Sequence, residues 1–297
     1  IDAGADGLEL NFGCPHGMCE RGMGSAVGQE PKVNEEITSW AVDYSTVPVL
    51  VKLTPNVGDI RPHGLAAQAG GGHGVSLINT IKSIIGVDID RFVMEPRVGS
   101  RSTNGGYCGA AVRPIALHMC AALARDPRFN IPISGIGGIT NWRDAVEFLL
   151  LGSSSVQVCT EVMLRGYRIV EDMIEGLNEY MDSKGMATMD DIVGRAIPSF
   201  SEWGNLDLNY EIVAEIDPAK CIGCQVCVVA CHDGAHQCIH PTGEGRVPVI
   251  DLDECVGCNL CQIVCPGPDC ISMVAVDNGH QPAAGNDHVA GTGAPRP

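Results

Sequence analysis

The sequence predicts an α/β fold: a partial (β/α)8 TIM barrel with about five of its eight strands, followed by a small cysteine-rich domain. Two observations predict it. Apolar runs dense in Val, Ile and Leu alternate with helical patterns through residues 1–185, as buried parallel strands and their crossover helices do. After residue 217, eight of the 15 cysteines fall into two copies of one motif.

The strand candidates are short and are separated by helical patterns. They are residues 7–11 (GLELN), 48–54 (PVLVKLT), 74–80 (GVSLINT), 131–136 (IPISGI) and 155–160 (SVQVCT). In TNWRDAVEFLLLG, Asn141 is placed as a helix N-cap and Gly152 lies just past the helix end. In RPIALHMCAALAR, Pro114 suits a first helical turn.

The strand ends favour a barrel over an open doubly wound sheet, although both architectures repeat βα units. Barrel enzymes carry their chemistry at the C-terminal ends of the strands. The residues at or just after those ends are Asn11, Lys52, Asn79, Thr80, Gly137, Gly138, Cys159 and Thr160. Because a typical barrel takes about 250 residues, we expect about three βα units to be missing upstream of Ile1.

Composition divides the rest of the chain. We expect a connector at residues 186–216, a separate cysteine-rich domain at 217–275 and a disordered Gly/Pro/Ala-rich tail at 276–297.

The net charge of −17 argues against nucleic acid or an anionic membrane as a partner. The sequence shows no run of about 18 apolar residues that would span a membrane, and no signal peptide. Cysteines at cluster spacing then predict a reducing cytoplasm.

The cysteine-rich domain contains two copies of C-x2-C-x2-C-x3-C, the signature of a bacterial-type 2[4Fe–4S] ferredoxin domain. In such domains the fourth cysteine of each copy binds the cluster of the other copy. One cluster is therefore predicted to take Cys221, Cys224, Cys227 and Cys265, and the other Cys255, Cys258, Cys261 and Cys231.

Zinc is the alternative for C-x2-C pairs, but zinc needs four ligands in two pairs and leaves the third cysteine of each copy without a role. Cys238 and Cys270 lie outside the motif and are predicted to be small buried apolar side chains. A two-cluster domain transfers single electrons, so it needs a donor and an acceptor.

A flavin accepts single electrons and passes on a hydride. The stretches GIGGI and VQVCTE follow the last two predicted strands and suit a phosphate cradle, to which Gly109 could add a close backbone approach; a tight turn alone is the alternative for GIGGI. Lys52 ends an apolar strand, where a lysine needs a negative partner. That partner is either the anionic edge of a reduced flavin or a core carboxylate.

Several stretches together resemble the flavin- and cluster-bearing subunit of the bacterial two-subunit, NAD-dependent dihydropyrimidine dehydrogenases. The wider barrel group includes dihydroorotate dehydrogenase. The stretches are GADGLELNFGCPHGMCERGMG, KLTPNV, LINT, GGYCGAAVRPIAL, GIGGI and VQVCTEV, followed by the ferredoxin repeat. The family usually carries serine where this chain has Gly13.

The resemblance implies roles for individual residues. Cys14 is implied to be the general acid, and Asn11, Asn79 and Thr80 to bind the pyrimidine. The implied FMN contacts are Lys52, Gly109, Ile136, Gly137, Gly138, Cys159 and Thr160. Electrons are implied to pass from NADH through FAD on a partner subunit, then through the two [4Fe–4S] clusters and FMN, to the C5=C6 bond of uracil or thymine. The chain is thus expected in a hetero-oligomer.

The residue chemistry agrees with these roles. Reduction puts a hydride on C6 and a proton on C5, because the C4 carbonyl polarises the double bond. An ordinary thiol, with a pKa of about 8.5, holds a proton at neutral pH. An Asn amide offers both the donor and the acceptor that a pyrimidine edge requires. The alternative for Cys14 is a buried structural thiol, and His16 could orient the loop.

Two other functions compete with this one. A dihydroorotate-type oxidoreductase would need a positive group for the orotate carboxylate, which Asn79 and Thr80 do not supply. A non-catalytic electron-transfer module on a decayed barrel would not need the intact loop residues.

Overall fold

The computed structural model describes residues 1–16, 21–206, 209, 211–243 and 246–276. The chain divides into two compact units, residues 1–200 and 201–297. The boundary falls inside the stretch that we expected to be a connector, residues 186–216. The predicted disordered tail lies outside the described residues, except for Val276.

The first unit is built on a parallel sheet of five strands: β1 (Leu8–Asn11), β2 (Val49–Lys52), β3 (Gly74–Leu77), β10 (Ile133–Ile136) and β11 (Ser155–Gln157). All five predicted strands are confirmed. The spatial order β1-β2-β3-β10-β11 follows the chain order. A barrel wall has this order, whereas a doubly wound sheet reverses direction at a switch point.

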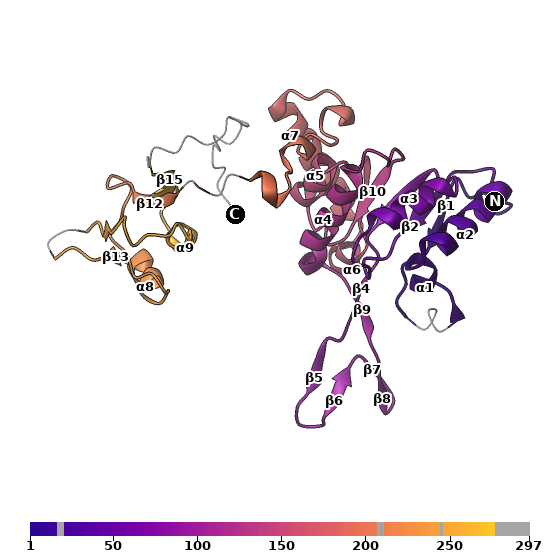
Figure 1. The fold of residues 1–297 in the computed structure, drawn as a ribbon, viewed down its shortest axis with the longest axis horizontal. Coiled ribbons are helices and arrows are strands. Elements are labelled where there is room, and N and C mark those ends of the chain that lie inside the picture. Colours follow the sequence, from indigo (N-terminus) through magenta and orange to yellow (C-terminus); the bar gives the residue numbers. More distant parts are fainter. Residues whose placement is uncertain (17–20, 207–208, 210, 244–245, 277–297) are drawn as a thin grey trace. The chain divides into compact units, whose positions relative to one another are not determined.

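Helices follow the strands and bury one face against the sheet (Figure 1). They are α1 (Ser25–Gly28), α2 (Pro31–Tyr44), α3 (Arg61–Ala69), α4 (Arg113–Ala124), α5 (Trp142–Leu150), α6 (Thr160–Arg165) and α7 (Arg168–Lys184). Asn141 caps α5 as predicted, because its side chain accepts the backbone N–H groups of Arg143 and Asp144. Pro114 lies in the first turn of α4, also as predicted. The core between sheet and helices includes Leu77 and Phe148, both fully buried.

Residues 81–107 form an antiparallel extension, which we call the arm and which we did not predict from the sequence. In it β4 (Ile81–Ser83) pairs with β9 (Gly105–Tyr107), β5 (Gly86–Asp88) with β6 (Val93–Glu95), and β7 (Arg97–Val98) with β8 (Arg101–Ser102). The arm projects away from the sheet and its helices (Figure 1). Its base, β4 and β9, adjoins the C-terminal end of β3.

The described residues of the second unit form short antiparallel pairs and short helices. The pairs are β12 (Ile212–Ile216) with β15 (Ile271–Ala275), and β13 (Ile239–His240) with β14 (Val249–Ile250); the helices are α8 (Val226–His232) and α9 (Leu260–Val264). Short 3-10 helices also occur among the described residues: η2 (Ala110–Val112), η3 (Met189–Asp191), η4 (Ile197–Ser199) and η5 (Trp203–Asn205). Within the described residues, no helix combines the length and the apolar character that crossing a membrane requires.

Candidate functional site

A cavity of about 180 Å³ opens at the C-terminal ends of the strands in the first unit. Its walls come from the ends of β2, β10 and β11, from the loop after β3 and from the turn before α4. Every residue predicted to contact FMN lines it, and so do two of those predicted to bind substrate: Lys52, Asn79, Thr80, Gly109, Ile136, Gly137, Gly138, Cys159 and Thr160. The fold thus brings residues from five segments of the chain to one cavity.

The turn after β10 can approach a ligand closely because it consists of glycines. Gly137 and Gly138 have φ values of 137° and 75°, in the region that favours glycine. A Cβ atom on Gly138 would lie 2.8 Å from both the Arg113 backbone nitrogen and the Gly109 carbonyl oxygen. No side chain fits there, so bare backbone faces the cavity beside the start of α4, an arrangement that suits a flavin phosphate.

An ion pair next to the Gly137–Gly138 turn stabilises this region. The Arg113 guanidinium pairs with the buried carboxylate of Asp144, on α5. The Thr140 backbone N–H and hydroxyl donate to the same carboxylate at 2.8 and 2.7 Å. We did not predict this network from the sequence, although an acidic residue in the first turn of α5 is visible there.

Lys52 has a protein carboxylate as its partner. Its Nζ lies 3.1 Å from Glu9 Oε1 on the neighbouring strand β1 and donates to Gln157 Oε1 on β11 at 3.1 Å. Ser76 and Gln157 donate to the other Glu9 oxygen at 2.7 and 2.8 Å. The negative partner of Lys52 in the structure is therefore the carboxylate of Glu9, whose side chain is 33% exposed and so lies outside the core, while Lys52 also lines the cavity.

This network shifts the pKa of Glu9. Burial raises the pKa, but the hydrogen bonds from Gln157 and Ser76 and the charge of Lys52 outweigh burial and leave it below the ordinary value of 4.5. Glu9 and Gln157 were not predicted as site residues. The sequence did contain a signal for Glu9: it is the one acidic residue in the apolar strand β1, and the neighbouring strand β2 ends in Lys52.

The amide oxygen of Asn11 organises the loop that carries Cys14. It accepts the backbone N–H groups of Gly13 and Cys14 at 3.2 and 3.1 Å, and the Asn79 side-chain amide at 3.0 Å. The three residues predicted for proton donation and substrate binding at this loop, Asn11, Cys14 and Asn79, are thus joined through one atom. Gly13 makes this possible, since a Cβ atom there would lie 2.3 Å from Asn79 Cβ.

His16 links this loop to the arm. Its Nε2 accepts the Gly106 backbone N–H at 3.1 Å, and its Nδ1 lies 3.7 Å from Cys14 Sγ. Because Nε2 is an acceptor, the ring proton of the neutral imidazole belongs on Nδ1, facing the sulfur. The arm therefore sets the tautomer of the histidine that touches Cys14.

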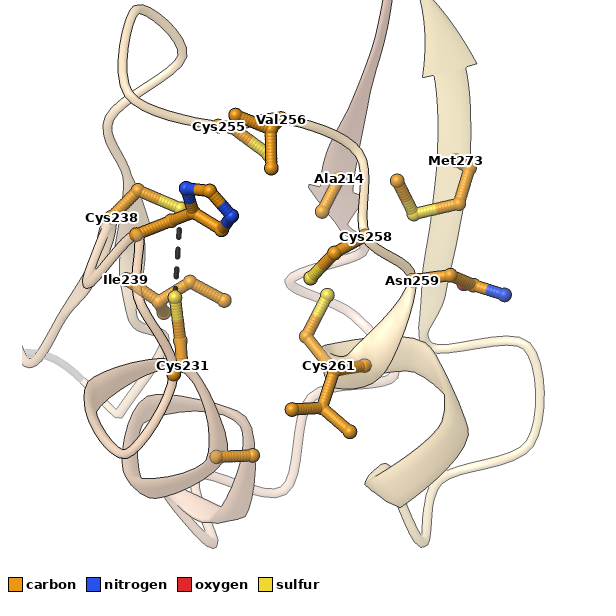
Figure 2. Close-up of a pocket in the computed structure, with 14 residues that line it drawn as sticks. Ala214, Cys231, Cys238, Ile239, Cys255, Val256, Cys258, Asn259, Cys261 and Met273 are labelled. Carbon is orange, nitrogen blue, oxygen red and sulfur yellow. Dashed lines mark hydrogen bonds between the residues drawn. The ribbon is translucent and has the colours of Figure 1, made fainter.

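The eight motif cysteines of the second unit surround two cavities. One is lined by Cys221, Cys224, Cys227 and Cys265, and the other by Cys231, Cys255, Cys258 and Cys261 (Figure 2 shows the second). Each set takes three cysteines from one motif copy and the fourth from the other, as the predicted ligand sets do. In the described part of the chain, no three Cys, His, Asp or Glu side chains converge on one point as the ligands of a single ion would. Four thiols around a cavity suit a four-iron cluster.

Two family matches cover these two units. The dihydroorotate dehydrogenase family matches residues 1–181, which is more than half of the chain. The chain belongs to the dihydroorotate dehydrogenase family. The family consists of FMN flavoenzymes built on the TIM barrel, which confirms the predicted fold class of the first unit. The 4Fe–4S dicluster domain family matches residues 214–273 and confirms the predicted ferredoxin fold class of the second unit.

Three relatives illustrate the range of the similarity. The chain is 43% identical over 248 residues to the NAD-dependent dihydropyrimidine dehydrogenase subunit PreA of Escherichia coli, covering 83% of this chain and 60% of the relative. It is 45% identical over 193 residues to the dihydroorotate dehydrogenase B (NAD(+)) catalytic subunit of Pyrococcus horikoshii, covering 65% and 60%. It is 42% identical over 202 residues to the chloroplastic dihydropyrimidine dehydrogenase (NADP(+)) of Arabidopsis thaliana, covering 67% and 47%. The chain thus spans about half to three fifths of these relatives.

Proposed function

We propose that the chain reduces the C5=C6 bond of uracil or thymine to the 5,6-dihydropyrimidine, as a dihydropyrimidine dehydrogenase. The observation that carries this proposal is the Asn11 oxygen that joins Asn79 to the Cys14 loop beside the cavity. Two amides and a thiol held together are the groups needed to bind a pyrimidine edge and to protonate its ring. The 43% identity to a relative of that name, over 83% of this chain, supports the proposal.

The residues of the site have separate tasks in this reaction. Asn11 and Asn79, with Thr80, bind the pyrimidine, and Cys14 donates the proton to C5. His16 holds the Cys14 sulfur through its Nδ1–H. The glycine turn at Gly137–Gly138, with Gly109, Ile136, Cys159 and Thr160, holds FMN, and Lys52 lies at the ring. Bound FMN supplies the hydride chemistry at C6.

The electrons come from NADH by way of a partner. We assign NADH and FAD to a partner subunit in a hetero-oligomer. The word "subunit" in the name of the Escherichia coli relative agrees with this. The two [4Fe–4S] clusters then carry single electrons to FMN. We place the reaction in the cytoplasm, where thiols and clusters stay reduced.

Dihydroorotate oxidation is the second candidate, because the Pyrococcus horikoshii relative bears that name. Its substrate carries a carboxylate. Among the residues that line the cavity, the basic side chain is Lys52, which already pairs with Glu9. The geometry therefore favours an uncharged pyrimidine.

Rapid mixing of the reduced, FMN- and cluster-loaded protein with substrate tests the proposal. Uracil or thymine should oxidise the flavin, and Cys14→Ala should slow this step by ~10²–10⁴-fold, the usual contribution of general acid catalysis. Cys14→Ser should also stay slow, since a hydroxyl is a far weaker acid. Equal rates in wild type and Cys14→Ala would refute the role of Cys14. If orotate oxidises the reduced flavin and neither uracil nor thymine does, the proposed substrate is wrong.

A further inference from the structure

Each cluster cavity of the second unit contains a fifth cysteine. Cys238 lines the cavity of Cys231, Cys255, Cys258 and Cys261, and Cys270 lines that of Cys221, Cys224, Cys227 and Cys265. Cys238 and Cys270 are 4% and 3% exposed, so the expected burial is confirmed. Figure 2 shows the Cys238 sulfur turned toward the same space as the four motif cysteines. Burial alone does not require a thiol at both positions.

The two additional cysteines have the same local setting. The residue before each, Gln237 or Asp269, has a φ of 51°, a left-handed conformation that is uncommon for residues other than glycine. The residue after each, Ile239 or Ile271, is 2% exposed and begins a short strand. The same unusual backbone step therefore precedes a cavity-facing thiol in both halves of the domain.

The two thiols have equivalent contacts with the motif cysteines. Cys238 Sγ lies 3.6 Å from Cys231 Sγ, and the thiol also interacts with that of Cys255. The Cys270 thiol interacts with those of Cys265 and Cys221, and its Sγ also lies 4.0 Å from the Asp217 carbonyl oxygen, a further acceptor for its proton. In both cavities the additional thiol thus contacts the fourth cysteine of one motif copy and the first cysteine of the other. Those two cysteines are predicted ligands of a single cluster.

We propose that Cys238 and Cys270 are hydrogen-bond donors to the cysteine sulfurs that hold the two clusters, and that they raise the reduction potentials of those clusters. A thiol that does not bind iron carries a proton, which it can donate to a neighbouring thiolate. Reduction adds negative charge to a cluster and its sulfur ligands, so a donor stabilises the reduced form more than the oxidised form. This inference rests on the dicluster domain and not on the identity of the pyrimidine.

Matched substitutions separate a donor from a packing residue. Cys238→Ala removes the S–H group, whereas Cys238→Ser keeps a donor of similar size. Cys270→Ala and Cys270→Ser make the same pair in the other cavity. Ile239→Val, in the wall beside Cys238, changes packing without changing a donor. The full chain, loaded with clusters, is used throughout, and iron content is measured beside each potential by EPR-monitored redox titration.

We expect Cys238→Ala to retain the iron of both clusters and to shift one midpoint potential to a more negative value, leaving the other in place. Cys270→Ala should shift the other potential. Both serine variants and Ile239→Val should stay near the wild-type values. Loss of iron from either alanine variant would overturn the proposal, because the thiol would then be a ligand. Unchanged potentials in both alanine variants, or equal shifts in alanine and serine variants, would also overturn it.

Discussion

At the residue scale, Asn11 has two tasks that its side chain divides between two atoms. The oxygen accepts three N–H groups and shapes the Cys14 loop. The amide nitrogen remains the group that can donate to a substrate carbonyl. From the sequence we predicted only substrate binding for Asn11, because its spacing from Asn79 does not show that the two side chains share a hydrogen bond.

Substitutions at Asn11 can separate the two tasks. Asn11→Asp keeps the oxygen acceptors and removes the amide donor, so we expect a higher KM for uracil with the loop intact. Asn11→Ala removes both, and kcat should fall as well, because Cys14 loses its position. Steady-state kinetics, with thermal unfolding as the folding control, distinguish the variants. Identical kinetics for the two would argue against a separate loop task.

Gly13 decides how close Asn79 can come to Asn11. In Gly13→Ser, the new Cβ would overlap Asn79 Cβ, and the Asn79–Asn11 hydrogen bond should break. We expect KM for uracil to rise about 3–10-fold, since a hydrogen bond contributes about 0.5–1.5 kcal/mol. Gly58→Ser is the control, because an added side chain there meets open space. A Gly13→Ser enzyme with wild-type KM would show that the contact is dispensable.

Glu9 should make the stability of the first unit depend on pH. Its pKa in the folded protein lies below 4.5, so its contribution to the free energy of unfolding is present above pH 4.5 and is lost as the pH falls through the folded value. Denaturant unfolding of wild type and Glu9→Gln across this range measures the contribution. The difference between the two should shrink toward low pH. If the difference in unfolding free energy between wild type and Glu9→Gln does not vary with pH, Glu9 does not contribute to the loss of stability in acid.

At the scale of elements, the base of the arm contributes directly to the site around Cys14. Strand β9 provides the Gly106 N–H group that fixes the ring of His16. In Gly106→Ala, a Cβ would lie 2.3 Å from Thr80 Oγ1 and 3.2 Å from His16 Cε1, so both side chains must move. The arm is therefore coupled to the Cys14 loop through His16, and it also contacts Thr80 beside the cavity.

Gly106→Ala should lower the rate of uracil reduction by about 10-fold, within the range that general acid catalysis contributes, while FMN binding stays near wild type. Gly86→Ala, also in the arm, is the matched control, since its added Cβ meets no atom within 4 Å. Rapid-mixing flavin oxidation and an FMN titration provide the two readouts. Similar rates in the two variants would show that the arm base has no influence on Cys14.

At the scale of the whole molecule, the two units differ in the kind of core that stabilises each of them. The first has an apolar core between sheet and helices. The buried core of the second consists of Ala214, Cys227, Val228, Cys238, Ile239, Cys261, Cys270 and Ile271. Half of these described core residues are cysteines, so they bury little apolar surface, and we expect the fold of the second unit to depend on its clusters.

Removing the clusters should therefore unfold the second unit and spare the first. Hydrogen exchange of the full chain, before and after oxidation with a chelator, measures both units in one sample. We expect exchange to rise across residues 211–276 and to change little in the parallel sheet. Equal protection in both states would show that the second unit folds without iron.

The sequence by itself determined the five strands of the parallel sheet, the start of α5 and the cluster motif, because these depend on near neighbours. Apolar runs located the five strands, the Asn141 side chain marked the start of α5, and the cysteine spacing predicted the dicluster domain. Polar residues at the strand ends pointed to one edge of the sheet, since parallel strands bring their C-terminal ends together. Each of these inferences needs only a short stretch of chain or a fixed architecture.

Only the tertiary structure decided which side chains meet. Glu9 and Gln157 are 148 residues apart and His16 and Gly106 are 90 apart, so no local pattern relates them. The arm contains short strands of two or three residues, which carry too little periodicity to be recognised. Cys238 and Cys270 lie outside the motif, and their places in the cavities come from the turns before them. Strand register and loop path set these contacts, because a shift of one residue along a strand turns its side chains to the other face.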